Sequence, residues 1–243
     1  MQEHRLHFPL LPRKKNTDKS SYGHTLVLAG SFSYRGAALL TSRAALVSGS
    51  GLVTLGIPQS LGEFFSKKAL AETMLLELPQ TKKNTIAFSA RRVVEDFLKK
   101  RRVSAVALGP GLSRYPETAR FVRETVRRVR APIVLDADGL NAFEGKKSVL
   151  RKHAGKLVLT PHRKEFERLF EESWPEDKIK RQTLAKKLSR FYDGVLVLKS
   201  HETLVAWRDR IYWNKTGNPG MAKGGSGDVL TGIIASFISQ GLD

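Results

Sequence analysis

Short apolar runs alternate along the chain with longer segments in which apolar residues recur every three or four positions. A short run bounded by glycine or proline is typical of a buried strand, and the longer spacing is typical of an amphipathic helix. We predict strands at 25–29, 52–56, 73–76, 105–108, 133–136, 157–159 and 195–199, and helices at 37–48, 89–100, 117–129, 163–170, 176–188 and 228–239. This alternation predicts an α/β fold with a mostly parallel central sheet and helices on both faces.

The pattern changes after residue 199. Two apolar runs, 203–207 and 210–213, flank Arg208-Asp209 and predict a β-hairpin. A glycine-rich segment, 217–227, then leads into the last predicted helix. No repeat and no low-complexity linker divides the chain, so we expect a single domain over 1–243.

Residues that are able to take part in catalysis or ligand binding follow several of the predicted strands. In parallel sheets, ligands bind beyond the carboxyl ends of the strands. Those ends carry Gly30-Ser31, Gly109-Pro110-Gly111, Asp136, His162 and Lys199. We therefore expect the functional site along this edge of the sheet.

The glycine-rich segment is the most informative one. Gly224, Gly225 and Gly227 directly precede a helix, and Asp228 falls in its first turn. Residues without side chains let several backbone N–H groups converge on an anion, and the helix N-terminus adds partial positive charge. An aspartate here can also be a simple helix cap, but a cap does not account for the glycines before it. A phosphate site with Asp228 as catalytic carboxylate accounts for both.

Two familiar nucleotide-binding loops do not fit the sequence. A Walker A loop requires Gly-Lys-Ser/Thr after four free positions, which no lysine here provides. A dinucleotide fingerprint requires a third glycine after G-x-G, but Thr54, Arg114 and Leu230 stand in the three possible places.

The segment Asp136-Ala-Asp138-Gly-Leu-Asn141 has two interpretations. Two carboxylates at a strand end can hold Mg²⁺ through water, with Asp136 the stronger candidate. The same residues can form an Asx turn that caps a short helix.

His162 and Lys199 are weaker candidates on their own. A lone histidine is more often structural than catalytic, although Glu165, three residues on, can pair with His162. Lys199 closes a predicted strand and is placed to reach a phosphate. Ser89 is a candidate N-cap for the helix at 89–100.

The chain has no cysteine, so disulfides, thiolate metal sites and a catalytic cysteine are excluded. Any metal must bind oxygen or imidazole, for which Mg²⁺ is the best match. No run of about 18 apolar residues predicts a membrane span, and the N-terminus has no signal-peptide pattern. We therefore expect a cytoplasmic protein that does not bind membranes.

The charge is unusual, with 42 Lys+Arg against 23 Asp+Glu, a net +19. Nucleic-acid binding, steering of a polyanionic substrate and a solvated basic surface are three possible explanations. The densest clusters, 99–102 and 127–130, fall at the ends of predicted amphipathic helices, where cations suit the helix dipole. This position favours the solvated surface.

The run Asn218–Gly232, NPGMAKGGSGDVLTG, resembles the signature of the ADP/ATP-dependent NAD(P)H-hydrate dehydratases, a branch of the ribokinase-like superfamily. Further landmarks of that family follow in the same order along nearly the whole chain: Tyr22-Gly23-His24, Gly30-Ser31, Gly36-Ala37-Ala38, Gly109-Pro110-Gly111-Leu112, Asp136–Asn141, Thr160-Pro161-His162 with Glu165, and Lys199 to Thr203. Single pieces also occur in sugar and vitamin kinases, whereas the whole set in order is specific.

The resemblance implies repair of NADHX or NADPHX, the nicotinamide cofactor hydrated at C6. The enzyme would phosphorylate that hydroxyl with ADP or ATP and Mg²⁺, and loss of phosphate would restore the ring. By position, the hydrated cofactor would contact Ala37, Gly111, His162 and Asp228. The adenine nucleotide would contact Lys199, Ser200, His201, Glu202, Thr203, Gly225, Ser226 and Gly227.

The resemblance also bears on organisation. The chain ends soon after the signature helix, so we expect a catalytic domain whose C-terminal helices are short or absent. Family members are commonly homotetramers, and many are fused to an epimerase domain, for which there is no room before Tyr22. A homo-oligomer and a separate NAD(P)H-hydrate epimerase partner are the corresponding expectations.

Two alternative functions are kept. A ribokinase-like kinase for a vitamin precursor would share the glycine loop and Asp228, and an accumulating phosphorylated product would identify it. A basic nucleic-acid-binding protein rests on the charge alone, because the sequence has no recognition helix, zinc ligands or aromatic RNA-binding signature.

Overall fold

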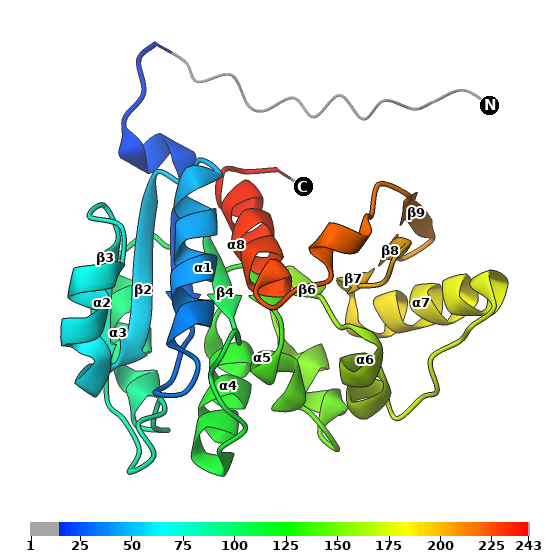
Figure 1. Cartoon of the computed structure of the whole chain (residues 1–243), viewed down its shortest axis with the longest axis horizontal. Helices are drawn as coiled ribbons and strands as arrows, with labels where there is room; N and C mark the ends of the chain where they lie inside the picture. The colour runs from blue at the N-terminus through cyan, green and yellow to red at the C-terminus, as the bar shows by residue number, and fades with distance from the viewer. Residues whose placement is uncertain (1–14, 243) are drawn as a thin grey trace.

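A nine-stranded sheet forms the centre of the molecule, in the order β3-β2-β1-β4-β5-β6-β7-β8-β9 (Figure 1). The structure is a computed structural model and describes residues 15–242. The strands are β1 His24–Leu28, β2 Leu52–Pro58, β3 Met74–Leu78, β4 Ala105–Leu108, β5 Ile133–Leu135, β6 Leu157–Leu159, β7 Gly194–Leu198, β8 Thr203–Trp207 and β9 Arg210–Asn214. β1 to β7 are parallel, and β8 and β9 are antiparallel additions at one edge.

Helices cover both faces of the sheet (Figure 1). They are α1 Arg35–Val47, α2 Gly62–Lys68, α3 Ala90–Lys100, α4 Pro116–Arg128, α5 Asp138–Asn141, α6 Arg163–Phe170, α7 Lys178–Tyr192 and α8 Ser226–Ser239, with short 3-10 turns at Lys19–Tyr22, Gln59–Leu61, Lys147–Lys152 and Pro219–Met221. The α/β, mostly parallel fold expected from the sequence is therefore confirmed.

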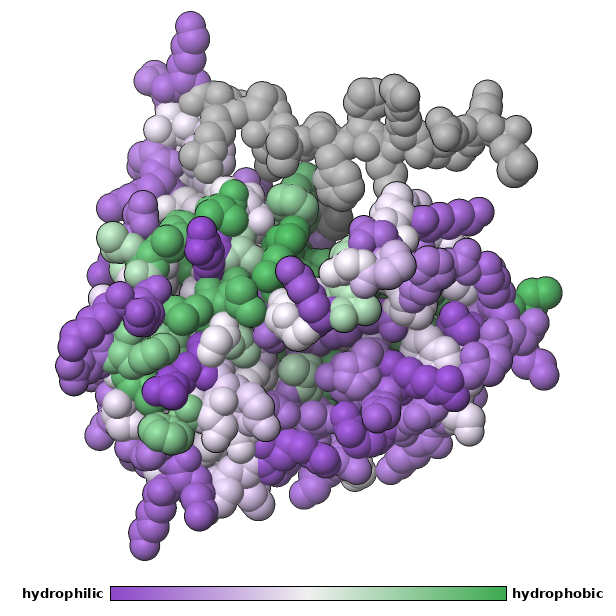
Figure 2. Space-filling view, in the orientation of Figure 1, coloured by the Kyte–Doolittle hydropathy of each residue, from purple (hydrophilic) through white to green (hydrophobic). Residues whose placement is uncertain are grey.

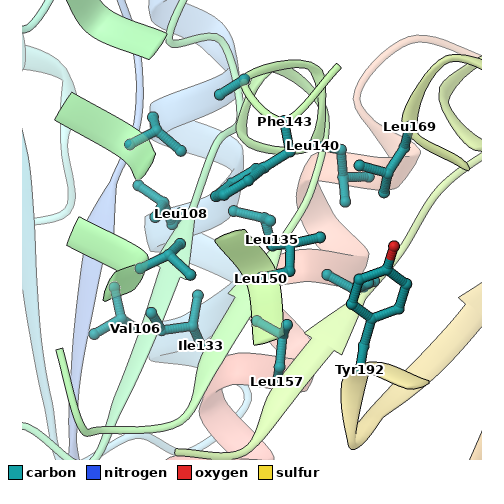
Figure 3. Packing of buried hydrophobic residues seen from close by; sticks show 14 of the residues in the cluster. Val106, Leu108, Ile133, Leu135, Leu140, Phe143, Leu150, Leu157, Leu169 and Tyr192 are labelled. Carbon is teal, nitrogen blue, oxygen red and sulfur yellow. The ribbon is translucent and has the colours of Figure 1, made fainter. Parts of the chain in front are cut away.

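Successive side chains of the strands point to opposite faces of the sheet and pack into two separate hydrophobic cores, one on each face. Leu26, Leu28, Leu108 and Leu135 point to the side covered by α3, α4, α5, α6 and α7, and Figure 3 shows this core from close by. Val27, Leu55 and the other residues of the second core face α1, α2 and α8. Strands buried on both sides explain why the sequence shows continuous apolar runs rather than alternation.

α1 and α8 pack very closely. A Cβ built at Gly232 would lie 2.3 Å from the Thr41 carbonyl oxygen and 2.8 Å from Ala44 Cβ. Ala38, Ala45 and Ala235 are also fully buried between these helices and the sheet. Small residues on both helices therefore let α1 and α8 approach each other closely over the sheet. Figure 2 shows that apolar residues also gather on the outer surface of this helix pair.

Most predicted elements are confirmed within a few residues, and the hairpin lies where it was expected. α2 was not predicted. Ser89 occupies the N-cap position of α3, but its predicted side-chain cap is wrong. The N–H groups of Ala90, Arg91 and Arg92 already donate to backbone carbonyls of the preceding turn, which leaves no donor for the hydroxyl to cap.

Among residues 15–242, no helix has the combination of length and apolar character that crossing a membrane requires.

Candidate active site

The ends of β5, β6 and β7 and the beginning of α8 meet at one edge of the sheet. Asp136 directly follows β5, His162 lies two residues beyond Thr160 at the end of β6, and Lys199 follows β7. The Lys199 N–H donates to the Pro161 carbonyl (2.9 Å), and His162 and Lys199 form an isolated parallel bridge. Parallel pairing thus brings side chains that are far apart in sequence to a common edge.

A buried ion pair lies at the centre of this edge. The Lys199 ammonium donates to Asp136 Oδ1 at 2.7 Å, and the Thr231 hydroxyl donates to Asp136 Oδ2 at 2.8 Å. The side chains of Lys199 and Asp136 are 19% and 2% exposed. Both oxygens of the carboxylate are therefore satisfied, as a buried charge requires.

Glu165 and His162 form the next layer. The backbone N–H of His162 donates to Glu165 Oε2, and the N–H groups of Lys164 and Glu165 approach His162 Nδ1 at 3.1 and 3.4 Å. Nδ1 is thus an acceptor, so a neutral ring carries its proton on Nε2, which lies 3.2 Å from Glu165 Oε1. Burial, and then the charges of Lys199 and Arg168, lower the pKa of His162, in keeping with the neutral form.

The carboxyl group of Glu165 is itself shifted. Burial raises the pKa of Glu165 to about 7, and the negative charge of Asp136 acts in the same direction. Lys199, whose ammonium lies 3.9 Å from Glu165 Oε2, opposes this shift. Burial therefore makes Glu165 hold a proton more tightly than an exposed glutamate does.

The glycine-rich segment leads into α8, and the first turn of that helix lies next to the ion pair. Gly225 is the residue before the first turn of α8, with φ 92°, and no side chain caps the helix. A Cβ at Gly227 would lie 3.3 Å from Lys199 Nζ and 3.6 Å from Asp136 Oδ2. The uncapped N–H groups and Lys199 therefore face one region, which suits an anion.

Asp228 lies in the first turn of α8, as predicted. Burial raises the pKa of Asp228 to about 6, and Asp136 adds to the rise while Lys199 opposes it. A carboxylate with a pKa close to the working pH is ionised at pH 7 and still basic enough to take a proton, which is what general-base catalysis needs.

The two predicted substrate contacts beyond β1 and β4 lie side by side. Gly111 has φ 64°, and a Cβ there would lie 2.9 Å from Ala37 Cβ and 2.7 Å from Tyr34 Cβ. Only glycine combines this backbone conformation with such close contact. The next loop is equally tight, because a Cβ at Gly109 would lie 1.9 Å from the Asp136 carbonyl oxygen.

The predicted nucleotide contacts after β7 form a compact turn. The Ser200 hydroxyl donates to the Glu202 carbonyl, and the Thr203 hydroxyl donates to the Ser200 carbonyl. Lys199, Ser200, His201 and Glu202 line a cavity of about 600 Å³ together with His162, Arg163, Lys164, Trp174, Glu176, Lys178 and Arg181. This basic cavity adjoins the ion pair through Lys199. Gly225, Ser226 and Gly227 are not among the residues that line it, although a Cβ at Gly227 would lie 3.3 Å from Lys199 Nζ.

The described residues do not form a metal site of their own, but they fit a metal ion that is bound together with a nucleotide. Within residues 15–242, no three His, Asp or Glu side chains gather to hold an ion. Mg²⁺ commonly binds through one or two carboxylates together with substrate phosphates, so it fits here as an ion carried by a bound nucleotide. The prediction that Asp136 contacts it through water remains a prediction.

The short helix after β5 does not use the predicted Asx turn. α5 begins after Ala137, which has φ 51°, and no side chain caps it. Asp138 instead accepts from the Ser113 N–H and from the Asn141 amide. The aspartate thus ties the β5 loop to the β4 loop.

Sequence reasoning did not assign a role to Thr231. Its hydroxyl satisfies the second oxygen of Asp136. A weak signal existed, because Thr231 lies three residues after Asp228 and so on the same side of α8.

A mostly parallel sheet with a glycine-rich helix N-terminus and an adjacent carboxylate defines a ribokinase-like enzyme. A ribokinase-like superfamily protein from Enterococcus faecalis has the same fold, with a TM-score of 0.77 at 26% identity over 94% of this chain and 75% of its own. Adenosine kinase from Sinorhizobium meliloti, 11% identical with a TM-score of 0.58, shares the fold alone.

The family model described as NAD(P)H-hydrate dehydratase matches residues 25–243. The chain belongs to this family of enzymes. It is 30% identical to the ADP/ATP-dependent NAD(P)H-hydrate dehydratase from Bacillus subtilis, solved after co-crystallisation with ATP/Mg²⁺, with a TM-score of 0.75 over 93% of this chain and 75% of that one. It is 42% identical over 234 residues to the bifunctional NAD(P)H-hydrate repair enzyme Nnr of Moorella thermoacetica.

The chain spans less than half the length of the curated relatives it matches. The alignment covers 96% of this chain but 44% of the Moorella protein, and a similar enzyme from Thermofilum pendens, 37% identical, is also covered over 44% of its length.

Proposed function

We propose that the chain catalyses the ADP- or ATP-dependent dehydration of NADHX or NADPHX back to NADH or NADPH. The observation that carries this proposal is the placement of Asp228. It lies in the first turn of an uncapped glycine-led helix, beside the buried Asp136–Lys199 pair, with its pKa raised to about 6. Membership of the dehydratase family supplies the substrate class.

The first step is phosphoryl transfer to the hydroxyl at C6 of the hydrated ring. The hydroxyl oxygen forms a bond to the terminal phosphorus of the nucleotide, the bond from that phosphorus to the bridging oxygen breaks so that ATP leaves as ADP or ADP as AMP, and Asp228 accepts the hydroxyl proton. The N–H groups around Gly225 and Gly227 stabilise the charge on the transferred group. When bound, Mg²⁺ neutralises the nucleotide phosphates.

The second step is elimination. The lone pair of the ring nitrogen forms a double bond to C6 as the C6–O bond breaks, and phosphate leaves with the electrons of that C6–O bond. C5 then gives up a proton to the departing phosphate or to water, and the C5–H electrons form the C5–C6 double bond and return the lone pair to nitrogen. The site contributes position rather than new chemistry, because phosphate is already a good leaving group.

Lys199 has a positioning role in this proposal. Its ammonium is held by Asp136 on one side and lies close to Gly227 on the other. Asp136 keeps the cation in place, and Thr231 keeps Asp136 in place. The charge of Lys199 therefore faces the region in which the transferred phosphate would pass.

The test is the absorbance of restored dihydronicotinamide in the near ultraviolet. NADHX, Mg²⁺ and protein are combined with ADP or ATP in parallel reactions. A nucleotide-dependent rise supports the dehydratase and identifies the donor. A phosphorylated product without a rise would indicate the kinase alternative, and binding of RNA or DNA with steep salt dependence would revive the nucleic-acid alternative.

Partners and location follow from the same reaction. We propose that the chain acts together with an NAD(P)H-hydrate epimerase activity, since the relatives named bifunctional combine two activities in one longer chain. We also propose a homo-oligomer, which is what the family resemblance implies. The substrates, nicotinamide cofactor and adenine nucleotide, assign the reaction to the cytoplasm. Light scattering tests the oligomeric state, and co-purification tests the association with an epimerase.

A further inference from the structure

A second cavity lies beyond the predicted substrate contacts, away from the nucleotide side. It has a volume of about 440 Å³ and is lined by Ser31, Phe32, Ser33, Tyr34, Lys83, Thr85, Ser113, Arg114, Tyr115 and Pro116. We call it the distal pocket. Its walls come from the loops after β1, β3 and β4, which open at the same edge of the sheet as the catalytic residues.

The distal pocket is continuous with the predicted substrate contacts through Tyr34. A Cβ built at Gly111 would lie 2.7 Å from both the Tyr34 Cβ and its carbonyl oxygen, and 2.9 Å from Ala37 Cβ. A bound substrate that extends from the catalytic centre past Ala37 and Gly111 therefore reaches Tyr34.

Ser31 indicates that the pocket takes a polar ligand. The residue is 1% exposed, and its hydroxyl has no hydrogen-bond partner within the described part of the chain. A buried hydroxyl without a partner costs free energy, and a ligand in the pocket that hydrogen-bonds to Ser31 would remove that cost.

The charge of the pocket indicates an anion. Lys83 is exposed and makes no ion pair within residues 15–242, and Arg114, which also lines the pocket, forms a half-exposed pair with Glu144. The 13-residue helix α4 begins at Pro116, with Tyr115 at its N-cap position, and no side chain caps it. Free N–H groups at a helix N-terminus and two cations are a phosphate-binding combination.

Exposed aromatic rings complete the pocket. Phe32 and Tyr34 are 53% and 55% exposed, which is unusual for side chains of this size. Rings presented in this way beside cations are suited to stack on a nucleobase.

We propose that the distal pocket binds the adenosine-phosphate half of the hydrated dinucleotide. Tyr34 stacks on the adenine ring, and Lys83 and the start of α4 contact the phosphates. This proposal rests on the proposed function. It assigns to these residues a role in distinguishing the dinucleotide from a mononucleotide that carries the same reactive ring.

The kinetic test compares two substrates, NADHX and the hydrated form of reduced nicotinamide mononucleotide, which lacks the adenylate half. Lys83→Met and Tyr34→Ser should each lower the ratio of kcat/KM for the dinucleotide over the mononucleotide, by about tenfold and about fivefold. Tyr34→Ser keeps the Cβ that packs at Gly111 and removes only the ring.

The chain offers a matched control for each variant. Lys82→Met changes the same charge in the same loop at a residue that does not line the pocket. Tyr212→Ser removes a ring that is 45% exposed on β9, away from the pocket. Both controls should keep the wild-type ratio.

A binding test separates this proposal from the proposed function. ADP-ribose is titrated calorimetrically into the protein while a non-hydrolysable ATP analogue saturates the nucleotide site. Weaker binding in Lys83→Met and Tyr34→Ser but not in the controls supports the distal pocket, even if the dehydratase assay is silent. Unchanged binding together with an unchanged substrate ratio in an active enzyme would overturn it.

Discussion

Charged side chains serve two different purposes in the interior and at the surface of this molecule. At the ends of β5, β6 and β7, Asp136, Glu165 and Lys199 are 2%, 6% and 19% exposed, and the Lys199 ammonium lies 2.7 Å from Asp136 and 3.9 Å from Glu165. At the surface, pairs such as Lys67–Glu63, with side chains 69% and 82% exposed, are surrounded by solvent. A few interior charges therefore define the site, and the many exterior ones contribute the net charge.

The surface clusters have ordinary surroundings. Lys99, Lys100, Arg127 and Arg128 lie in the last turns of α3 and α4, as expected, and Glu124 pairs with both arginines. This arrangement favours a solvated basic surface as the explanation of the charge of +19. Exposed pairs contribute about 0–1 kcal/mol, whereas breaking a buried pair costs about 3–5 kcal/mol. The following substitutions test that contrast.

The largest effect is expected from Asp228→Asn. Loss of the general base should lower kcat by about a thousandfold, while urea unfolding should remain close to wild type because the amide has the same shape. Asp193→Asn, which removes an exposed carboxylate paired with Arg208, serves as the control. Activity near the wild-type level in Asp228→Asn would contradict the assignment of Asp228 as the general base.

Lys199→Met should be the most destabilising change. It leaves Asp136 buried with one hydrogen bond and no counter-charge, so the free energy of unfolding should fall by about 3 kcal/mol in urea titrations. Adding Asp136→Asn should recover much of this loss, since the isolated charge then disappears. A double variant as unstable as Lys199→Met would show that the charge pair is not the cause.

Gly227→Ala should impair the reaction without unfolding the protein. The added methyl would lie 3.3 Å from Lys199 Nζ, between the ammonium and the approaching phosphate, and we expect kcat/KM to fall by roughly 30-fold. Gly224→Ala is the control in the same loop, because nothing lies within 4 Å of its Cβ. Equal losses in both variants would mean that general loop flexibility matters rather than this contact.

The pH dependence should follow Asp228. Because its pKa is raised to about 6, the basic form is lost as pH falls below that value, and log kcat/KM should decrease with a slope near one down to about pH 5, a loss of about tenfold. The measurement is kcat/KM as a function of pH. As a control, nucleotide binding is measured over the same pH range and should stay constant. A plateau extending to pH 4.5 would contradict the role of Asp228 as base.

The smallest effect is expected at the surface. Lys67→Met breaks the exposed pair with Glu63 on α2 and should change the free energy of unfolding by about 0.5 kcal/mol or less. High salt should reduce even this difference. A loss comparable to that of Lys199→Met would erase the contrast between the two regions.

β4, α8 and α2 illustrate how much of the fold was predictable from the sequence. β4 was predicted at its observed limits, and α8 begins two residues before the predicted start at Asp228. Both signals are local, since apolar runs and glycine breaks lie within one segment. α2 was missed because it has seven residues and packs mainly through Phe65.

The candidate site was predicted in part. The sequence placed Asp228, the glycines and the strand-end residues at one edge, because parallel strands expose their carboxyl ends together. It did not pair Asp136 with Thr231 and Lys199, which are 95 and 63 positions away. Nor did it indicate the distal pocket, which loops after β1, β3 and β4 form together.

The sequence by itself determined the elements, their order and the residue types at the catalytic edge, since periodicity and glycine placement act over a few neighbouring residues. Only the tertiary structure decided which charges became partners and how far their pKa values moved. Burial and distance set those properties, and both arise when β5, β7 and α8 pack together. The buried ion pair beside Asp228 is therefore a product of the fold, although each of its residues was visible in the chain.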